Sequence, residues 1–313
     1  MYFPQQAFIN SESLCSMNEI KRRDYSILSQ QSIMPDPFLL SSRHAHQRDT
    51  PSSRASIPSV SIIIPTFNES ENIINLIKSI IANHGSLGIK QLEVIVVDDN
   101  SPDGTADLVE RFSKEEGMRN RSNPIKIVRR QEKTGLRSAI LDGFSSASGD
   151  IAVVMNADLS HPPELIPEMI RQIAHKKELD LVIASRYIEG GRMEGVGLKR
   201  RFISIVATKV AQYTLDTKEV KDPLSGFFAI RRIAVRDIKF DAIGYDKILQ
   251  EILVKSDLRT IVQLHYTFRD SREGGSKLDI QSKVQYLKTC RKLSSYKQEQ
   301  ERRDDASAIP EET

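Results

Sequence analysis

Oxygen-bearing side chains that could bind a metal ion gather in the turn 156–160. This turn follows the apolar run 151–155, which is typical of a buried strand, and it contains Asn156, Asp158 and Ser160. A carboxylate at the carboxyl end of a buried parallel strand lies where open α/β sheets bind ligands. Asp158 is therefore placed to hold Mg²⁺ or Mn²⁺, since both cations prefer oxygen ligands. The turn alone does not decide between a metal site and a helix cap, because Asx residues also begin many helices.

Two further acidic turns follow apolar runs. Glu69 follows one run, and Asp98 and Asp99 follow another. The carboxyl ends of parallel strands meet at one edge of a sheet, so these carboxylates are expected to lie near Asp158. Three acidic turns at one edge favour a binding site over three unrelated caps. Asp99 or Glu69 could accept hydrogen bonds from a base or a ribose there.

Basic side chains lie in the second half of the chain. Arg186 and Arg200 flank a Gly-rich segment, and Arg272 and Lys277 belong to a later charged loop. Acidic turns bind phosphate only through a metal ion, whereas Arg suits bidentate phosphate contacts and Lys acts as a point charge. The combination indicates a metal-bound nucleoside-diphosphate donor that meets a second anionic substrate.

The turn sequences argue against two common nucleotide-binding folds. The chain contains no G-x-x-x-x-G-K-[ST] motif, so a P-loop NTPase is not expected. The first strand is followed by the run 65–69 instead of a Gly-x-Gly-x-x-Gly turn, so a dinucleotide-binding fold is not expected either.

Strands and helices alternate through most of the chain. Apolar runs of strand length and segments with apolar residues at helical spacing follow one another from Val60 onward. The expected strands are 60–64, 93–97, 125–128, 151–155, 179–184 and 261–266, and the expected helices are 73–81, 105–116, 138–146, 163–175 and 204–214. This alternation predicts an α/β fold with a mostly parallel sheet and right-handed crossovers.

Composition narrows the class of protein. The 313 residues carry a net charge of +3, which gives no support to a nucleic-acid binder, and 39% of them are hydrophobic, a low share for a chain packed throughout. Cys15 and Cys290 lie far apart and form no metal-ligand spacing, which fits a reducing compartment. No apolar run reaches the roughly 18–20 residues that span a bilayer, and no signal-peptide pattern is present. We therefore expect a cytoplasmic protein, soluble or peripheral to a membrane.

Both ends of the chain differ from the middle. Residues 1–57 are rich in Ser, Gln, Arg and Pro without a sustained period, which predicts disorder. Residues 281–313 predict a basic amphipathic helix with a frayed tail, in which Val284 and Leu287 continue an apolar stripe. Such a helix could lie on an anionic membrane, or it could pack its apolar stripe on the rest of the domain.

Six blocks of sequence, in the same order, resemble the dolichol-phosphate mannosyltransferases. The blocks are 65–69, 97–105, 157–164, 185–187, 222–229 and 276–278. This family contains inverting glycosyltransferases of the GT-A fold, in which a mostly parallel central sheet carries helices on both faces. The resemblance implies a GT-A domain over residues 58–280 and does not extend to the N-terminal segment.

The resemblance implies a role for each matching position. Binding of the nucleotide-sugar donor falls to Pro65, Phe67 (usually Tyr), Glu69, Val97, Asp99, Asn156, Ala157, Asp158, Ser160, Lys247 and Lys277. Metal binding falls to Asn156, Asp158 and Ser160, and binding of a lipid phosphate falls to Arg186, Arg200 and Ser204. Catalysis would depend on Asp158, Arg186 and Arg200. Phe67 could instead be a core residue, Ser204 an ordinary helix residue and Lys247 a solvated charge.

The chemistry implied is transfer of a sugar, first of all mannose from GDP-mannose, to dolichyl or another polyprenyl phosphate. A phosphate monoester is largely dianionic at neutral pH, because its second pKa is about 6, and so it needs no strong general base. The tasks left to the protein are positioning, screening of two anions and stabilisation of the departing diphosphate through a metal. The lipid requires access to the cytosolic membrane face, either through the basic helix or through a membrane-anchored partner.

Three departures from the family pattern affect the expected activity. Asn156 stands where the metal turn usually begins with Asp, Ser271 (with Arg272 beside it) stands at the place of an Arg, and Gly275 replaces a Glu. The neutral amide of Asn156 keeps an oxygen ligand but removes a negative charge, so metal affinity should fall. Two alternatives therefore stay open: a UDP-glucose-dependent polyprenyl-phosphate glucosyltransferase, and a catalytically weakened paralogue that acts as a binding module.

Overall fold

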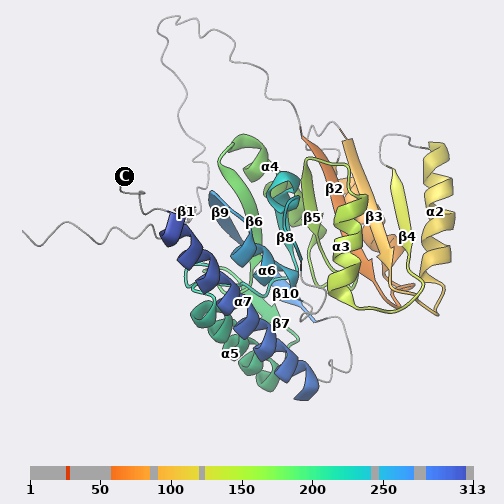
Figure 1. Cartoon of the computed structure of the whole chain (residues 1–313). Helices are drawn as coiled ribbons and strands as arrows, with labels where there is room; N and C mark the ends of the chain where they lie inside the picture. The colour runs from red at the N-terminus through yellow and green to blue at the C-terminus, as the bar shows by residue number, and fades with distance from the viewer. Residues whose placement is uncertain are drawn as a thin grey trace, which may run out of the picture.

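An eight-stranded sheet forms the centre of the fold. The computed structural model describes residues 26–28, 58–84, 91–119, 124–240, 247–270 and 280–307. The strands of the sheet are β1 (Ser26–Leu28), β2 (Ser59–Thr66), β3 (Gln91–Asp98), β4 (Ile125–Arg129), β5 (Ile151–Val154), β6 (Leu179–Ser185), β8 (Phe228–Arg231) and β9 (Thr260–His265). Their spatial order is β1-β9-β6-β8-β5-β2-β3-β4, and within the sheet β8 alone runs antiparallel to its neighbours (Figure 1). The prediction of an α/β fold with a mostly parallel sheet is confirmed.

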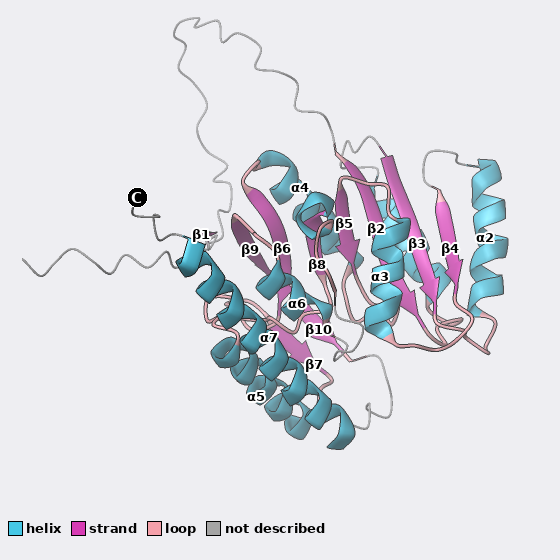
Figure 2. Cartoon of the chain, in the orientation of Figure 1, coloured by secondary structure: helices cyan, strands magenta, loops and turns pink. Residues whose placement is uncertain are grey.

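Helices cover both faces of this sheet (Figure 2). One face carries α1 (Ile73–His84), α2 (Thr105–Arg119) and α4 (Ile166–His175), the last preceded by the 3-10 turn η1 (Pro163–Leu165). The other face carries α3 (Leu136–Ser146) and α6 (Ile248–Lys255). Successive side chains of a strand point to opposite faces, so Ile62 and Ile64 of β2 pack beneath the first group and Ile63 packs beneath the second.

Two further helices, α5 (Leu198–Thr214) and α7 (Ile280–Ser307), lie side by side next to the sheet. Their buried seam is formed by Ala211, Leu215, Tyr286, Cys290 and Leu293. The Tyr286 hydroxyl also donates a hydrogen bond to the carbonyl oxygen of Ala207 at 2.5 Å. Helix α7 thus packs on the domain through a face other than the expected stripe, since Val284 and Leu287 are 46% and 55% exposed.

The helix expected at 204–214 begins earlier than predicted. Helix α5 begins at Leu198, directly after its N-cap Gly197. Lys199 and Arg200, which precede the expected helix, are strong helix formers and lie in the first turn. The expected start is therefore wrong, and Arg200 lies on the same helix as Ser204.

Short strands are also present where none is expected. Strand β1, inside the segment 1–57 for which disorder is expected, pairs in parallel with the edge strand β9. Residues 26–28 thus form a strand inside the segment expected to be disordered, and the rest of the segment lies outside the described residues. Strands β7 (Arg192–Glu194) and β10 (Thr267–Arg269) form a separate parallel pair within the expected loops.

No helix among the described residues is long and apolar enough to cross a membrane.

Candidate active site

The three acidic turns meet at one edge of the sheet. Strands β5, β2 and β3 are neighbours and run parallel, so the turns that follow them leave the sheet on the same side. This edge carries Asp158 after β5, Glu69 after β2, and Asp99 after β3. The Glu69 backbone N–H donates to Thr105 Oγ1 at 3.0 Å, which ties this turn to the start of α2. The sequence-based expectation that these carboxylates share an edge is confirmed.

The turn 156–160 is ordered by its own side chains. The Ser160 backbone N–H donates to Asp158 Oδ1 at 3.2 Å, and the Ser160 hydroxyl donates to the same oxygen. Leu159 has a φ of 57°, a left-handed conformation that few non-glycine residues adopt. The turn thus contains three oxygen-bearing side chains, each two residues from the next: the amide of Asn156, the carboxylate of Asp158 and the hydroxyl of Ser160.

This donor set fits a divalent metal that binds together with phosphate. Hard oxygen ligands suit Mg²⁺ and Mn²⁺, and Mg²⁺ is commonly held by one or two carboxylates plus substrate phosphates. In the part of the chain that the structure describes, no group of three or more His, Cys, Asp or Glu side chains could hold a metal. The protein therefore offers Asp158 as the charged ligand, with Asn156 and Ser160 as neutral ones.

The residues predicted to contact the nucleotide lie at the ends of β2 and β3. Pro65 and Val97 are opposite each other in these strands, and both are buried. Phe67 is half-buried and belongs to neither core cluster around the sheet, which does not support its alternative interpretation as a core residue. The Lys133 ammonium lies 3.3 Å from the centroid of the Phe67 ring. One face of this ring is thus already in contact with a cation.

The Asp99 carboxylate anchors the loop after β4. It accepts hydrogen bonds from the backbone N–H groups of Thr134 at 3.0 Å and Gly135 at 2.9 Å. It also forms an ion pair of 2.6 Å with Arg130. Gly135, at a φ of 100°, is the N-cap of α3, so Asp99 fixes the start of that helix. These contacts give Asp99 a structural role in addition to the nucleotide contact that the sequence predicts.

On the basic side, Arg186 forms a buried bidentate pair with Asp222. The Arg186 Nε and Nη2 groups each donate to the carboxylate of Asp222 at 2.8 Å, and the Arg186 backbone N–H donates to it at 3.1 Å. The Asp222 side chain is fully buried. Burial acts to lower the pKa of Arg186, but the charge and hydrogen bonds of Asp222 outweigh it, so the pKa lies above its ordinary value. Arg186 is therefore held permanently charged in one orientation.

Ser204 and Arg200 lie one turn apart on α5, on the same side as Arg186. The Tyr187 hydroxyl donates to Ser204 Oγ at 2.8 Å, and the Arg186 guanidinium lies 5.2 Å from the Tyr187 ring centroid. Arg200 forms an ion pair with Asp270. Residues four apart on a helix share a face, so the three residues expected to bind the acceptor phosphate lie near one another.

The acidic and basic sides meet at His161. Its ring is stacked on Phe227, with centroids 5.0 Å apart and an interplanar angle of 11°, and it meets the edges of Tyr266 and Phe268. A Cβ at Gly226 would lie 3.4 Å from both Asn156 Oδ1 and His161 Cε1, so the backbone there approaches closely. The segment that carries Asp222 thus packs directly on the metal turn.

Burial lowers the pKa of His161 to about 3, with opposing contributions from Asp158 and Arg186. Lys247, the N-cap of α6, also acts on this ring, so the structure places it near the site. Ala157 is buried in the core beside the turn. The remaining expected residues, Lys277 together with Ser271, Arg272 and Gly275, lie outside the described residues.

Sequence reasoning alone gave no role to His161, Asp222, Gly226 or Phe227. All four lie inside the blocks that resemble the family, and this was the available signal. Their contacts are with one another and with predicted residues across long sequence separations, which a single sequence does not display.

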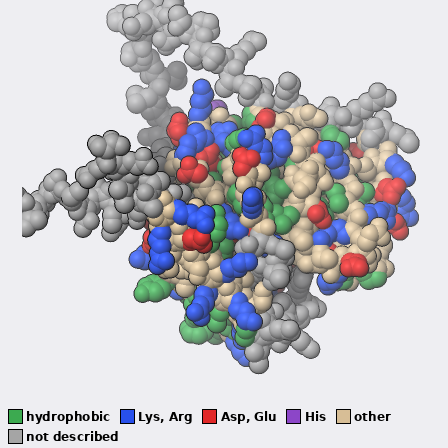
Figure 3. Space-filling view, viewed as in Figure 1, with side chains coloured by type: hydrophobic (Ala, Val, Ile, Leu, Met, Phe, Trp, Pro, Cys, Tyr) green, Lys and Arg blue, Asp and Glu red, His purple; other side chains and the backbone are tan. Residues whose placement is uncertain are grey.

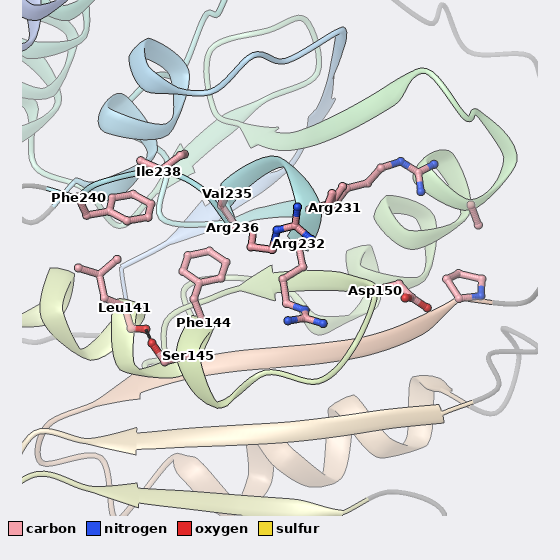
Figure 4. A pocket seen from close by; sticks show the side chains of 13 residues that line it. Leu141, Phe144, Ser145, Asp150, Arg231, Arg232, Val235, Arg236, Ile238 and Phe240 are labelled. Carbon is pink, nitrogen blue, oxygen red and sulfur yellow. Dashed lines mark hydrogen bonds between the residues drawn. The ribbon is translucent and has the colours of Figure 1, made fainter.

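A separate cavity lies at the opposite edge of the sheet (Figure 4). It has a volume of about 790 Å³ and lies next to Pro58 and Asp150, which precede β2 and β5. The Arg231 and Arg232 side chains line it, but both already donate hydrogen bonds to backbone carbonyl oxygens. This cavity shares no residue with the candidate active site.

Comparisons with known proteins agree on one family. The family model described as glycosyl transferase family 2 matches residues 61–239. A dolichol-phosphate mannosyltransferase of Pyrococcus furiosus is 40% identical over 244 residues, which cover 78% of this chain and 66% of that protein. A dolichol-phosphate mannosyltransferase of Saccharomyces cerevisiae is 32% identical over 248 residues, which cover 76% of this chain and 87% of that protein. The chain thus spans slightly less than two thirds of the archaeal relative.

Solved structures share the fold. A mannosyltransferase of Pyrobaculum calidifontis, in complex with GDP-mannose and Mn²⁺, superposes with a TM-score of 0.52 at 20% identity, covering 74% of this chain and 63% of that one. A glucosyl-3-phosphoglycerate synthase of Mycobacterium tuberculosis, in complex with phosphoglyceric acid, gives a TM-score of 0.57 at 22% identity and covers 76% of this chain and 80% of that one.

Proposed function

The chain belongs to glycosyl transferase family 2 and, within it, to the dolichol-phosphate mannosyltransferases, and on this premise we propose that it transfers mannose from GDP-mannose to a polyprenyl phosphate. One observation carries the proposal. The oxygen-bearing turn 156–160 is hydrogen-bonded to His161 through the Asn156 backbone, and the segment that carries Asp222, the partner of Arg186, packs on the same ring through Phe227. A site for a metal-bound diphosphate thus adjoins a site for a second anion.

Each side of the site has a task in this reaction. A phosphate oxygen of the acceptor forms the bond to the anomeric carbon while the bond to the nucleoside diphosphate breaks, and the departing diphosphate takes the electron pair. A bound metal would neutralise that diphosphate, and Asp158, Asn156 and Ser160 are the residues that would hold it. Arg186 binds the acceptor phosphate and keeps it oriented for in-line attack, because Asp222 fixes its guanidinium. The acceptor is already dianionic, so no side chain has to remove a proton.

The choice of GDP-mannose as the sugar donor depends on the relatives of this chain. The curated relatives are named for transfer of mannose, whereas the solved structures that share the fold include complexes with GDP-mannose and with UDP-glucose. The residues of the site do not by themselves select the base. GDP-mannose is therefore the first donor to test, and UDP-glucose is the second.

The test is transfer from radiolabelled GDP-mannose to polyprenyl phosphate with Mg²⁺ or Mn²⁺, with EDTA and UDP-glucose reactions in parallel. We expect metal-dependent labelled lipid from GDP-mannose. Asp158→Asn should lose at least about 100-fold in rate, because the charged metal ligand is removed. Glu164→Gln, an exposed acid in the adjoining turn, is the matched control and should keep the rate. Product from UDP-glucose alone would change the donor, and no product from either would contradict the transferase proposal in favour of a binding module.

A mixed apolar and basic surface, here termed the α5–α7 face, supports contact with a membrane. Its exposed apolar residues are Leu198, Phe202, Ile205, Val206, Val284 and Leu287. Exposed basic residues of the same helices surround them: Lys199, Arg201, Lys209, Lys283, Lys288 and Arg291. Figure 3 shows green and blue side chains together at the lower left of the molecule, where these helices lie in Figure 1. Single exposed apolar residues are ordinary, but a cluster rimmed by cations indicates an interaction surface.

We propose that the α5–α7 face lies on an anionic bilayer. The same helix α5 carries Arg200 and Ser204, so a phosphate at the membrane surface would meet the acceptor side of the site. The test is sedimentation with vesicles of phosphatidylserine and phosphatidylcholine. Phe202→Ser combined with Leu287→Ser should weaken binding at least tenfold, since each side chain contributes roughly 1.5–3 kcal/mol when buried. Ile233→Ser, at an exposed apolar residue of η2 (Arg232–Val235), should leave it unchanged. Absence of binding by the unmodified chain would instead favour recruitment by a membrane-anchored partner.

A further inference from the structure

His161 is buried and is surrounded by three aromatic rings. It is 2% exposed, and its ring is in contact with Phe227, Tyr266 and Phe268. Three aromatic rings around an imidazole restrict both its position and its rotation. Its nitrogens can therefore serve as a fixed reference point beside the metal turn.

One of these nitrogens closes the turn. His161 Nδ1 accepts a hydrogen bond of 3.0 Å from the backbone N–H of Asn156. This nitrogen accepts, so in the neutral ring the proton is on Nε2. The bond joins the first residue of the turn to the residue directly after Ser160. The ends of the turn are thus held together by a side chain, across a segment in which Leu159 has a left-handed backbone.

Further hydrogen bonds fix the side chains inside the turn. Ser160 donates two hydrogen bonds to Asp158 Oδ1, which orients that carboxylate relative to the backbone of the turn. The direction of the Asp158 and Asn156 oxygens therefore depends on where the turn begins and ends. Ligand-supporting hydrogen bonds of this kind commonly change metal affinity when they are removed.

We propose that His161 is a positioning residue for the metal site, which acts by fixing the backbone of Asn156 through Nδ1. This inference rests on the proposed function, because it requires a metal in the turn 156–160. This role differs in one respect from that of a residue that only packs in the core. The effect of a packing residue depends on the volume of its side chain, whereas the effect of a positioning residue depends on a hydrogen-bond acceptor at the place of Nδ1.

Two substitutions separate these roles. In His161→Asn the side-chain carbonyl oxygen can occupy the place of Nδ1, so the hydrogen bond to Asn156 survives while the ring is lost. In His161→Leu the volume is kept and the acceptor is lost. Phe227→Leu is the control, because it disturbs the packing of the imidazole and leaves its nitrogens intact.

The readout is Mn²⁺ affinity in the presence of GDP, measured by electron paramagnetic resonance on the full chain, together with the thermal unfolding midpoint. We expect about tenfold weaker Mn²⁺ binding for His161→Leu, since the partly buried N–H of Asn156 loses its partner. The Mn²⁺ affinity of His161→Asn should stay within about threefold of that of the unmodified chain, even if its unfolding midpoint falls as much as that of His161→Leu. Phe227→Leu should lower the midpoint but weaken Mn²⁺ binding much less than His161→Leu does, because the acceptor is kept and Tyr266 and Phe268 still pack on the imidazole. In transfer assays, His161→Leu should raise the KM for Mn²⁺ more than it lowers kcat at saturating metal.

Equal Mn²⁺ affinities for His161→Leu and the unmodified chain would overturn the role of His161. Equal losses in His161→Leu and His161→Asn would do the same, because the acceptor would then be irrelevant. No Mn²⁺ binding by the unmodified chain with GDP would overturn the proposed function as well, and this outcome is distinct from the other two.

Discussion

At the scale of single residues, the basic side of the site depends on the buried ion pair between Arg186 and Asp222. Asp222 has no exposed surface, and the carboxylate is compensated by Arg186 through two hydrogen bonds of 2.8 Å. Removing one member of such a buried pair leaves an uncompensated charge. The pair therefore contributes to stability, and it also orients the guanidinium that we propose as the binder of the acceptor phosphate.

The substitution Asp222→Asn tests this double role. We expect a loss of about 3 kcal/mol in the free energy of unfolding, because Arg186 stays buried without its counter-charge. The KM for the polyprenyl phosphate should rise about tenfold, while the KM for the donor changes little. Urea unfolding and steady-state kinetics measure the two effects. Asp216→Asn, at an exposed surface pair, is the control and should change neither.

The substitution Asn156→Asp tests the departure in the metal turn. A second carboxylate beside Asp158 adds negative charge for a divalent cation, so we expect tighter Mn²⁺ binding and a transfer rate that saturates at lower metal. Titration of the rate with Mn²⁺ measures this. If Asn156→Asp and the unmodified chain are equally active and need the same Mn²⁺ concentration, the amide of Asn156 is already a sufficient metal ligand. Inactivity of both forms would favour the binding module.

Residues that carry charge were the easiest to predict from the sequence. Asp158 and Arg186 were identified because their side chains have few roles at the ends of buried strands. Asp222 was missed because it pairs with Arg186 from another turn, and His161 was missed because its ring packs on Phe227, which also comes from another turn. A single sequence shows the residue types but not which distant turns come together.

At the scale of elements, Glu93 of β3 links three neighbouring segments. Its carboxylate accepts from Ser61 Oγ at 2.5 Å and from the Ser148 backbone N–H at 2.7 Å, and it forms an ion pair of 2.5 Å with Lys126. Burial alone would raise the pKa of Glu93, but these contacts outweigh it and lower the pKa to about 2. Strands β2, β3 and β4 and the start of β5 are thereby tied together at the edge opposite the site.

This linkage predicts a dependence of stability on pH. The pKa of Glu93 in the folded protein lies below its ordinary value of 4.5, so the contribution of Glu93 to stability is complete above that value and is lost as the pH falls toward 2. We expect Glu93→Gln to lower the unfolding free energy by about 2 kcal/mol at neutral pH and to reduce the loss on acidification. Thermal unfolding from neutral pH to pH 3 measures both effects. Glu115→Gln, at an exposed position of α2, should keep the acid sensitivity of the unmodified chain.

Elements with long periodic patterns were predicted well, and short ones were not. The run 60–64 gave β2 and the isoleucines after Ile73 gave α1, because each pattern repeats often enough to decide between strand and helix. Strands β7, β8 and β10 are three or four residues long, too short for a period to appear. The start of α5 was misplaced because the charge of Lys199 and Arg200 resembled a loop, although both favour helices.

At the scale of the whole molecule, α7 completes a core that α5 cannot close alone. Tyr286, Cys290 and Leu293 cover the apolar seam beside Leu215. Deleting residues 280–313 should therefore lower the unfolding free energy by at least about 4 kcal/mol, from the loss of these buried side chains. Deleting only 308–313 is the matched control and should have no effect. Urea unfolding compares the two, and equal stability would contradict the contribution of α7 to the core.

The placement of β8 sets an order in which the molecule can be completed during synthesis. Strand β8 lies between β5 and β6 and pairs with both. These two strands therefore cannot become part of one sheet until Arg231, the last residue of β8, has left the ribosome. The segment with β2, β3, β4 and β5 can pair as it emerges, since all its strands are neighbours and N-terminal units generally form first. Arg186, by contrast, gains its partner Asp222 only with the loop that leads into β8. A nascent chain would therefore hold the donor half of its site before the acceptor half exists.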